Sequence, residues 1–245
     1  MKIFIPLILL VTLYSANLFS QAKDKEERKK RFSSDSEFSL LAVSGNSNNT
    51  ALNLLTKNRW PIKINNIITF GGHYTYATDE ETLDTKNWDI NLRYERKVSK
   101  KLGFYLGTIY EVDTFAGYDS RDNVDVGVSY EVIATKDTEL GFEAGYRWMY
   151  EKDVEAVIQN DSKFRIYSKW EENITKNVGL VLWVEYLPNF TRSDDWMFNM
   201  EPSIWVDVSE VFGFKFAYKW RYRGLPPVDR ETTDITTTSS LLVRF

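Results

Sequence analysis

The sequence predicts an all-β fold, an antiparallel transmembrane β-barrel of about 12 strands. Three observations lead to this class. Apolar and polar residues alternate with a period of two through most of the chain, the alternating segments have roughly 12 to 15 residues, and short connections alternate with longer ones. Strands of soluble sheets usually have about five or six residues, whereas outer-membrane strands need about 9–11 for their apolar band alone.

The N-terminus has the pattern of an export signal. Lys2 precedes the apolar run IFIPLILLVTLYSANLF, and the following SQA ends in a small residue suited to cleavage after Ala22. A membrane-spanning helix is the alternative interpretation. No later window offers about 18 uncharged apolar residues. We expect a signal peptide, a charged periplasmic N-terminal segment and an outer-membrane barrel domain, at residues 1–22, 23–34 and 35–245.

Each expected strand is a run in which large apolar side chains alternate with polar ones. In FGFKFAYKWRYR every second residue is aromatic, and four of the residues between them are cations. A period of two puts the rings and the cations on opposite faces. KNWDINLRYERK, NVDVGVSYEV, LGFEAGYRWMY and DWMFNMEPSIWVDV repeat this pattern. The expected strands lie near residues 35–43, 49–60, 64–77, 86–97, 102–113, 121–134, 138–150, 162–172, 177–188, 195–208, 211–224 and 232–245.

In a membrane barrel the rings face lipid and the charged side chains face the lumen. A soluble lipocalin-like barrel or sandwich is the alternative, but it leaves the length of the strands unexplained. The candidate lumen-lining charges are Asp89, Arg93, Glu95, Asp125, Glu131, Glu143, Arg147, Arg165, Lys169, Glu185, Glu201, Asp207, Lys215, Lys219, Arg221 and Arg223. The candidate membrane-facing girdle consists of Trp88, Tyr94, Trp148, Tyr150, Trp196, Phe212, Tyr218, Trp220, Tyr222 and Phe245.

The signs of the lumen-lining residues nearly balance. Burying such charges is tolerable where they pair or keep water. We therefore expect a narrow, wet lumen crossed by ion pairs, with Glu201 and Asp207 beside the cationic strand 211–224.

The connections predict the orientation. With the N-terminus in the periplasm, the short connections PIK, VSKK, TKD, ITKN and SE are periplasmic turns, and TDEETLDT, TFAGYDS, EKDVEAVIQND, NFTRSD and LPPVDRETT lie outside. The outer segments are acidic, with Glu151, Asp161 and Asp195 among their carboxylates. We expect a solvated surface of like charge; loose Ca²⁺ or Mg²⁺ binding, shared with phosphates of lipopolysaccharide, is the alternative.

The expected partners follow from this location. They are outer-membrane lipids, lipopolysaccharide, and the barrel-assembly machinery, which would recognise the C-terminal aromatic Phe245. The net charge of −4 argues against a general nucleic-acid binder. The oligomeric state is left open.

No catalytic or metal site is expected. The chain has no cysteine, and its single histidine, His73, is expected to point into the lumen from the third strand. No GxSxG-like serine motif or HExxH motif accompanies it. Glycines in the strands relieve crowding in the barrel wall rather than bind phosphate. We therefore expect no cofactor and no enzyme activity, with an outer-membrane lipase or deacylase as the alternative.

Several segments, in this order and spacing, resemble a known family. They are VSGNSNNT, RDNVDVGVSYEV, LGFEAGYRW, VEYLPNF and GLPPVDRETTDITTTSSLLVRF. Together they resemble the putative salt-induced outer-membrane proteins, catalogued as domain of unknown function 481, from about Asp35 to Phe245. The resemblance implies an outer-membrane β-barrel without a defined activity. We expect a structural or narrow small-solute or ion-permeable barrel, linked to osmotic or salt response; a surface receptor or adhesin is the further alternative.

Overall fold

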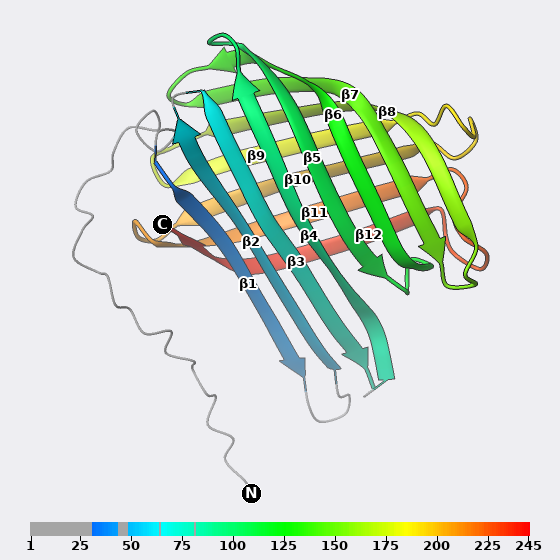
Figure 1. The fold of residues 1–245 in the computed structure, drawn as a ribbon. Coiled ribbons are helices and arrows are strands. Elements are labelled where there is room, and N and C mark those ends of the chain that lie inside the picture. The colour runs from blue at the N-terminus through cyan, green and yellow to red at the C-terminus, as the bar shows by residue number, and fades with distance from the viewer. Residues whose placement is uncertain (1–30, 44–48, 64, 81) are drawn as a thin grey trace, which may run out of the picture.

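The computed structural model describes residues 31–43, 49–63, 65–80 and 82–245, which form a closed antiparallel barrel of twelve strands (Figure 1). Each strand pairs with its neighbours in the chain, and the first pairs with the last. The predicted all-β barrel is therefore confirmed. The strands are β1 (Ser33–Val43), β2 (Asn49–Lys63), β3 (Asn66–Asp79), β4 (Thr82–Lys97), β5 (Leu102–Asp113), β6 (Tyr118–Ala134), β7 (Thr138–Asp153), β8 (Ile158–Asn173), β9 (Val178–Leu187), β10 (Met197–Asp207), β11 (Phe212–Arg223) and β12 (Thr233–Arg244).

The expected signal peptide and most of the charged N-terminal segment lie outside the described residues. Within the part of the chain that the structure describes, no helix is long and apolar enough to cross a membrane.

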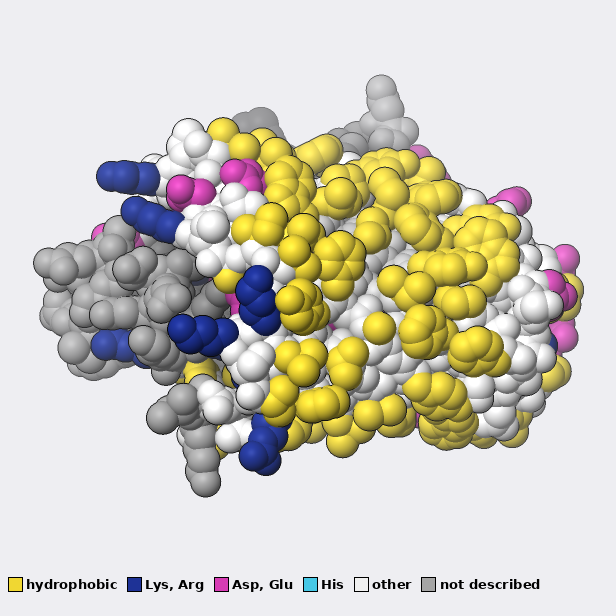
Figure 2. Space-filling model, turned by 90° about the horizontal axis from the view of Figure 1, so that it is seen from above, with side chains coloured by type: hydrophobic (Ala, Val, Ile, Leu, Met, Phe, Trp, Pro, Cys, Tyr) yellow, Lys and Arg dark blue, Asp and Glu magenta, His cyan; other side chains and the backbone are white. Residues whose placement is uncertain are grey.

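The two faces of the barrel wall differ as the alternation predicts. On β11, Phe214 and Phe216 are exposed on the outer face, while Lys215 points inward and bonds to β1 and β10. Figure 2 shows a broad hydrophobic surface, with charged side chains gathered towards the two ends of the barrel. A soluble sheet packs its apolar face inward, so this barrel has the reverse arrangement.

The interior contains little apolar packing. Met149, Leu187 and Met197 form the buried hydrophobic cluster of the described residues. The fully buried side chains include Lys163 and Glu151, which are charged. Buried charges are tolerated where they pair and form hydrogen bonds, so ion pairs are central to the interior.

Several strands extend further than the sequence predicted. β7 and β8 pair as far as Lys152↔Ile158, so the expected loop 151–161 shrinks to residues 154–157. The expected loops 78–85 and 114–120 are likewise shorter, because β3, β4 and β6 continue into them. The longest connections in the described chain, 188–196 and 224–232, lie at one end of the barrel. We call this the loop end and the opposite end the turn end.

The seam that closes the barrel is short. β1 and β12 are aligned only from Asp35↔Arg244 to Phe38↔Leu241, whereas β1 and β2 are aligned along the whole of β1. Backbone hydrogen bonds of 3.0 and 2.9 Å between Ser34 and Phe245 extend the seam at the turn end. Towards the loop end β1 and β12 diverge (Figure 1).

Candidate functional site: the charged interior of the barrel

Contacts between distant strands identify the interior. Arg93 on β4 bonds Glu143 on β7 at 2.7 Å, and Arg223 on β11 bonds Glu151 on β7 at 2.9 Å. Such contacts require side chains that point across the lumen. The antiparallel register places the other candidate lumen-lining charges on this same face of their strands.

A central cluster joins six strands, from β4 to β9. Its members are Arg93, Tyr105, Asp125, Glu143, Arg147, Arg165 and Glu185. Arg165 bonds Glu143 at 2.5 Å, Glu185 at 2.6 Å and the Tyr105 hydroxyl at 3.1 Å. Three arginines face these three carboxylates and Glu95, which bonds Arg93 at 3.2 Å, so the charges nearly balance, and forked guanidinium groups suit this crossing geometry.

Arg147 completes the central cluster through two carboxylates. Its guanidinium bonds Asp125 at 2.6 Å and lies 3.4 Å from Glu185. Both Arg147 and Asp125 are buried, which makes each dependent on its partner.

Tyr105 is an interior residue that the sequence analysis missed. The Arg93 guanidinium lies 4.0 Å from the centre of its ring, a cation–π contact. Its hydroxyl fits only because β6 and β7 carry glycine there: a Cβ at Gly127 or Gly145 would lie 2.7 or 2.6 Å from that oxygen. The pairing Gly127↔Gly145 between neighbouring strands is the sequence signal for a large side chain seated against the wall.

A loop-end cluster closes the interior near the loops. It consists of Arg121, Glu151, Asp161, Lys163, Arg192, Asp195 and Arg223. Asp195 accepts from Arg223 at 2.9 Å and from Lys163 at 3.2 Å, and the Lys163 ammonium also donates to the Asp195 backbone carbonyl at 2.7 Å. The segment 188–196 is therefore held inside the mouth of the barrel.

The expectation of a solvated acidic surface is wrong for four carboxylates, among them Asp153, which accepts hydrogen bonds from backbone amides of its own turn. Glu151, Asp161 and Asp195 are buried and ion-paired with cations of the loop-end cluster. Hydrogen bonds to Asp161 raise the pKa of Arg192, which keeps its guanidinium charged. No group of three or more His, Asp or Glu side chains among the described residues could hold a metal ion.

A seam cluster ties β1 to β10 across two intervening strands. Lys215 on β11 bonds Glu37 on β1 at 2.8 Å and Glu201 on β10 at 3.3 Å, so the contact with Glu201 that the sequence suggested is present. Asp207 instead bonds Arg244 on β12. It reaches past Gly213, where a Cβ would come within 2.6 Å of its carboxylate oxygen. The absence of a side chain at Gly213 thus leaves room for Asp207 to reach across β11 to β12.

The remaining candidate lumen residues lie outside these clusters, except Glu95, which borders the central cluster. Glu95 lies 3.2 Å from Arg93, and Glu131 and Lys169 pair with Lys97 at 3.1 Å and Glu171 at 3.0 Å. Lys219 lies over the ring of Trp183 at 5.8 Å. Arg221 makes no ion pair or side-chain hydrogen bond with another described residue.

The candidate girdle residues within strands lie on the outer face by the same register; Trp196 and Phe245 directly adjoin β10 and β12. Several of them stack: Trp196 and Tyr222 have ring centres 4.5 Å apart, and Trp220 and Tyr222 are 6.5 Å apart. Trp148 and Tyr150 form a further pair at 6.2 Å. Their role at a membrane interface stays a prediction.

His73 points into the lumen and belongs to a small polar group. Its Nε2 lies 2.9 Å from Asn53 Oδ1 and 2.8 Å from Thr75 Oγ1, and its Nδ1 lies 3.4 Å from Asp89 Oδ2. The order hydroxyl, imidazole, carboxylate is that of a hydrolase triad. However, the Thr75 hydroxyl donates to Asn53 at 3.0 Å, and the contact to Asp89 is too long for a strong hydrogen bond. The group is better suited to fixing side chains than to nucleophilic attack.

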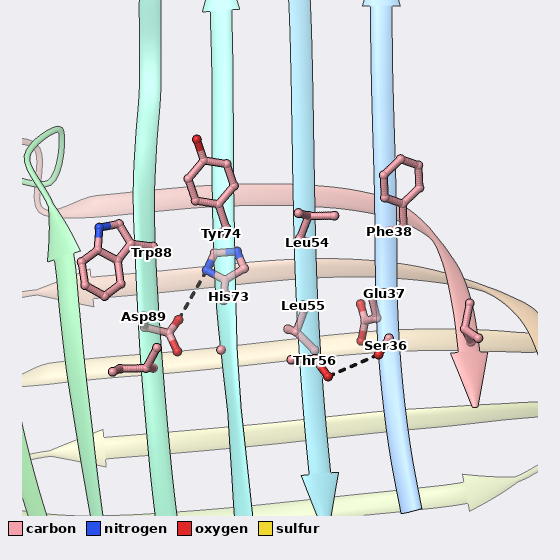
Figure 3. A pocket seen from close by; sticks show the side chains of 13 residues that line it. Ser36, Glu37, Phe38, Leu54, Leu55, Thr56, His73, Tyr74, Trp88 and Asp89 are labelled. Atoms are coloured by element: carbon pink, nitrogen blue, oxygen red, sulfur yellow. Dashed lines mark hydrogen bonds and ion pairs between the residues drawn. The ribbon is translucent and has the colours of Figure 1, made fainter. Parts of the chain in front are cut away.

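A groove of about 540 Å³ crosses β1 to β4 (Figure 3). Small residues on the outer face, Ser36, Thr56 and Gly72, lie side by side by register and form its floor. Larger apolar residues one step towards the loop end, including Phe38 and Trp88, form its rim. The groove reaches Val243 on β12 and therefore ends at the seam.

Comparisons with known proteins agree with this architecture. A family model described as "Protein of unknown function, DUF481" matches residues 36–245. No curated protein sequence matches the chain.

Solved structures share the fold at low sequence identity. An outer membrane channel from Pseudomonas putida F1 is similar with a TM-score of 0.55 and 8% identity, covering 88% of this chain and 96% of that chain. The NanC porin is similar with a TM-score of 0.51 and 12% identity, covering 86% and 97%. Identities this low show a shared fold and nothing further.

Proposed function

The chain belongs to the DUF481 family, and from this premise we propose that it is an outer-membrane β-barrel whose lumen passes only water and small ions. The hydrophobic outer face supports the membrane location, because a closed barrel leaves no unpaired backbone edge except at the open part of its seam. The balanced interior charge supports a lumen that discriminates weakly between anions and cations.

One observation supports the proposal that the lumen is narrow. Arg165 on β8 contacts Tyr105 on β5, Glu143 on β7 and Glu185 on β9, so its side chain occupies the space between these strands. Barrels of about eight strands are filled by side chains, and those of about sixteen leave a wide channel. In this twelve-stranded barrel, arginine–carboxylate bridges take up the additional width. A link to osmotic or salt response is part of the proposal, since a barrel of this kind would add wall area without adding a large leak.

Single-channel recording in planar bilayers tests the proposed function. We expect a conductance far below that of a sixteen-stranded porin recorded in the same salt, and a reversal potential near zero under a KCl gradient. The near balance of cations and carboxylates in the central cluster is the physical reason for the weak selectivity. Large, strongly ion-selective channels from the purified protein would contradict the proposal.

The orientation of the barrel is a separate prediction. With the loop end outside the cell, a cysteine introduced as Glu155→Cys reacts with an impermeant maleimide on intact cells, and Lys136→Cys reacts only after the outer membrane is opened. Both residues lie in exposed connections at opposite ends of β7, so they form a matched pair. The chain has no cysteine of its own, which makes the labelling unambiguous. The reverse labelling pattern would show that the barrel has the opposite orientation, and it would leave the fold unchanged.

A further inference from the structure

The seam leaves a gap between β1 and β12 on the side of the loop end. Past the pair Phe38↔Leu241, residues 39–43 of β1 and 233–240 of β12 are not aligned with each other. Both segments remain regular strands, because β2 and β11 pair with their opposite edges. The backbones of these two segments are therefore not paired with each other, and Figure 1 shows the two strands moving apart there.

The β12 edge of the gap is mostly polar on both faces, with the exposed Ile235 as its apolar exception. By register with β11, Thr236 and Thr238 point inward, and Thr237 and Ser239 point outward. Ser240, at the closed end of the gap, is buried, and its hydroxyl bonds to no other described group. Unpaired backbone groups are strongly disfavoured in hydrocarbon, so a hydroxyl-rich edge suits water or a polar head group rather than acyl chains.

The β1 edge of the gap is apolar. Leu40 and Leu41 point to opposite faces of the strand and are 60% and 56% exposed. Phe38 is the last residue of β1 that pairs with β12, and it is also part of the rim of the outer-face groove (Figure 3). The groove and the gap therefore adjoin, and together they form one apolar surface that leads from the outer wall to the opening.

Two cations face the lumen at the level of the gap. Lys219 and Arg221 lie on β11 opposite Thr236 and Asp234 of the free β12 edge. Within the described chain, neither makes an ion pair or a hydrogen bond through its charged group. Asp113 acts electrostatically on Arg221, and Asp89 and Glu111 act on Lys219, in each case without a direct contact. Glu201, beside Lys219, is already bonded by Lys215. These cations can therefore receive an incoming anion.

We propose that the gap is a lateral portal that binds an anionic amphiphile, a molecule with a carboxylate or phosphate head group on an acyl chain. The head group binds Lys219 and Arg221 inside the wall. The acyl chain lies along Leu40 and Leu41 and into the groove. The proposal rests on the membrane location proposed above and adds a ligand and a route that a simple narrow pore lacks.

A strand from another protein fits this gap less well. Neighbouring strands lie about 4.8 Å apart along their whole length. Because β1 and β12 diverge, one added strand could bond to both edges over a short distance only. The backbone of such a strand also supplies no negative charge for Lys219 and Arg221.

The ring of Trp183, which lies against Lys219, provides a direct measurement of head-group binding. The purified barrel is placed in nanodiscs of zwitterionic lipid, and heat-modifiable mobility on gels verifies that it is inserted. The probe is 2-bromohexadecanoate, whose bromine lies beside the carboxylate and quenches a nearby indole. The contribution of Trp183 is the part of the quenching that disappears in Trp183→Phe. We expect this contribution to saturate with the carboxylate probe and to be absent with 2-bromohexadecanol.

Charge variants test the head-group site. The double variant Lys219→Gln, Arg221→Gln should bind the carboxylate probe at least about tenfold more weakly, because a charge-assisted hydrogen bond is lost at each position. Lys136→Gln, in an exposed turn at the other end of the barrel, is the matched control and should bind normally. Equal binding by the double variant, or equal quenching by the alcohol, would overturn the head-group site while leaving the conductance prediction intact.

The route is tested with a bulky maleimide on a single introduced cysteine. Attached at Ser239→Cys in the gap, it should slow association of the probe at least about tenfold by blocking the portal. Attached at Glu155→Cys in a loop, it should leave the rate unchanged. Slowing at Glu155 but not at Ser239 would show entry through the mouth of the barrel and would overturn the portal. In the contrary outcome, an added β-strand peptide protects the free β12 amides from hydrogen exchange, while the probe has no effect. That outcome would show that the gap binds a strand and would overturn the amphiphile.

Discussion

Replacing Arg165 with alanine lowers the free energy of unfolding of the barrel by about 3–5 kcal/mol, the usual cost of removing one partner from a buried ion pair. Glu143 and Glu185 then lose a guanidinium at 2.5 and 2.6 Å, and the Tyr105 hydroxyl loses its donor. Arg93 and Arg147 still contact these carboxylates, so the cluster is weakened rather than abolished. The urea dependence of heat-modifiable mobility in lipid vesicles measures the change.

Two further variants make this result specific. Arg165→Lys keeps the charge but cannot form the same forked contacts, so its stability should lie between those of wild type and Arg165→Ala. Lys152→Ala removes an ion pair with Asp119 in which both side chains are 43% exposed, and it should change stability by about 1 kcal/mol or less. Equal stability of Arg165→Ala and Lys152→Ala would show that the central cluster does not stabilise the barrel.

Replacing Arg223 with alanine opens the mouth of the barrel and raises its single-channel conductance severalfold. Arg223 joins Glu151 on β7 to Asp195 in the segment 188–196, with both distances 2.9 Å. Without it, Asp195 keeps Lys163 and Arg192 as its cationic partners, while backbone hydrogen bonds to β8 and Gly224 still hold the ends of the segment. The loop-end cluster also loses one positive charge, so the reversal potential should shift towards cation selectivity.

Bilayer recordings of wild type, Arg223→Ala and Lys152→Ala under one KCl gradient check this prediction. Lys152→Ala removes a cation at the exposed rim and should leave conductance unchanged. An unchanged conductance in Arg223→Ala would place the narrowest part of the lumen in the central cluster. Arg165→Ala then becomes the variant expected to widen the pore.

The sequence predicted the barrel because the alternation within each strand identifies its apolar and its charged face. The alternation in FGFKFAYKWRYR needs no tertiary information, and the structure keeps it over Phe212–Arg223. The inward face of Arg93, Glu143 and Arg165 follows from the same period of two. Their contacts with one another do not, because they lie on different strands and depend on how the closed sheet brings those strands together.

The sequence was least informative where strands end. Glu151 and Asp195 look like loop carboxylates, since periodicity stops near them and acidic loops are usually solvated. Their burial depends on segment 188–196 turning inward to meet Lys163 and Arg223, which no local pattern specifies. The pairing of Asp207 with Arg244 was similarly hidden, because it requires the missing side chain of Gly213 on the strand between them.

The short seam between β1 and β12 gives the barrel the mechanics of a split ring. The central cluster links β4 to β9 across the lumen, whereas β1 and β12 are held together by four aligned residue pairs, the hydrogen bonds between Ser34 and Phe245 and the seam cluster. When such a barrel is deformed, the distance between β1 and β12 changes first and the linked strands β4 to β9 move last. Lateral tension in a surrounding bilayer would therefore be taken up as a change in the width of the gap, and the arc opposite would keep its shape.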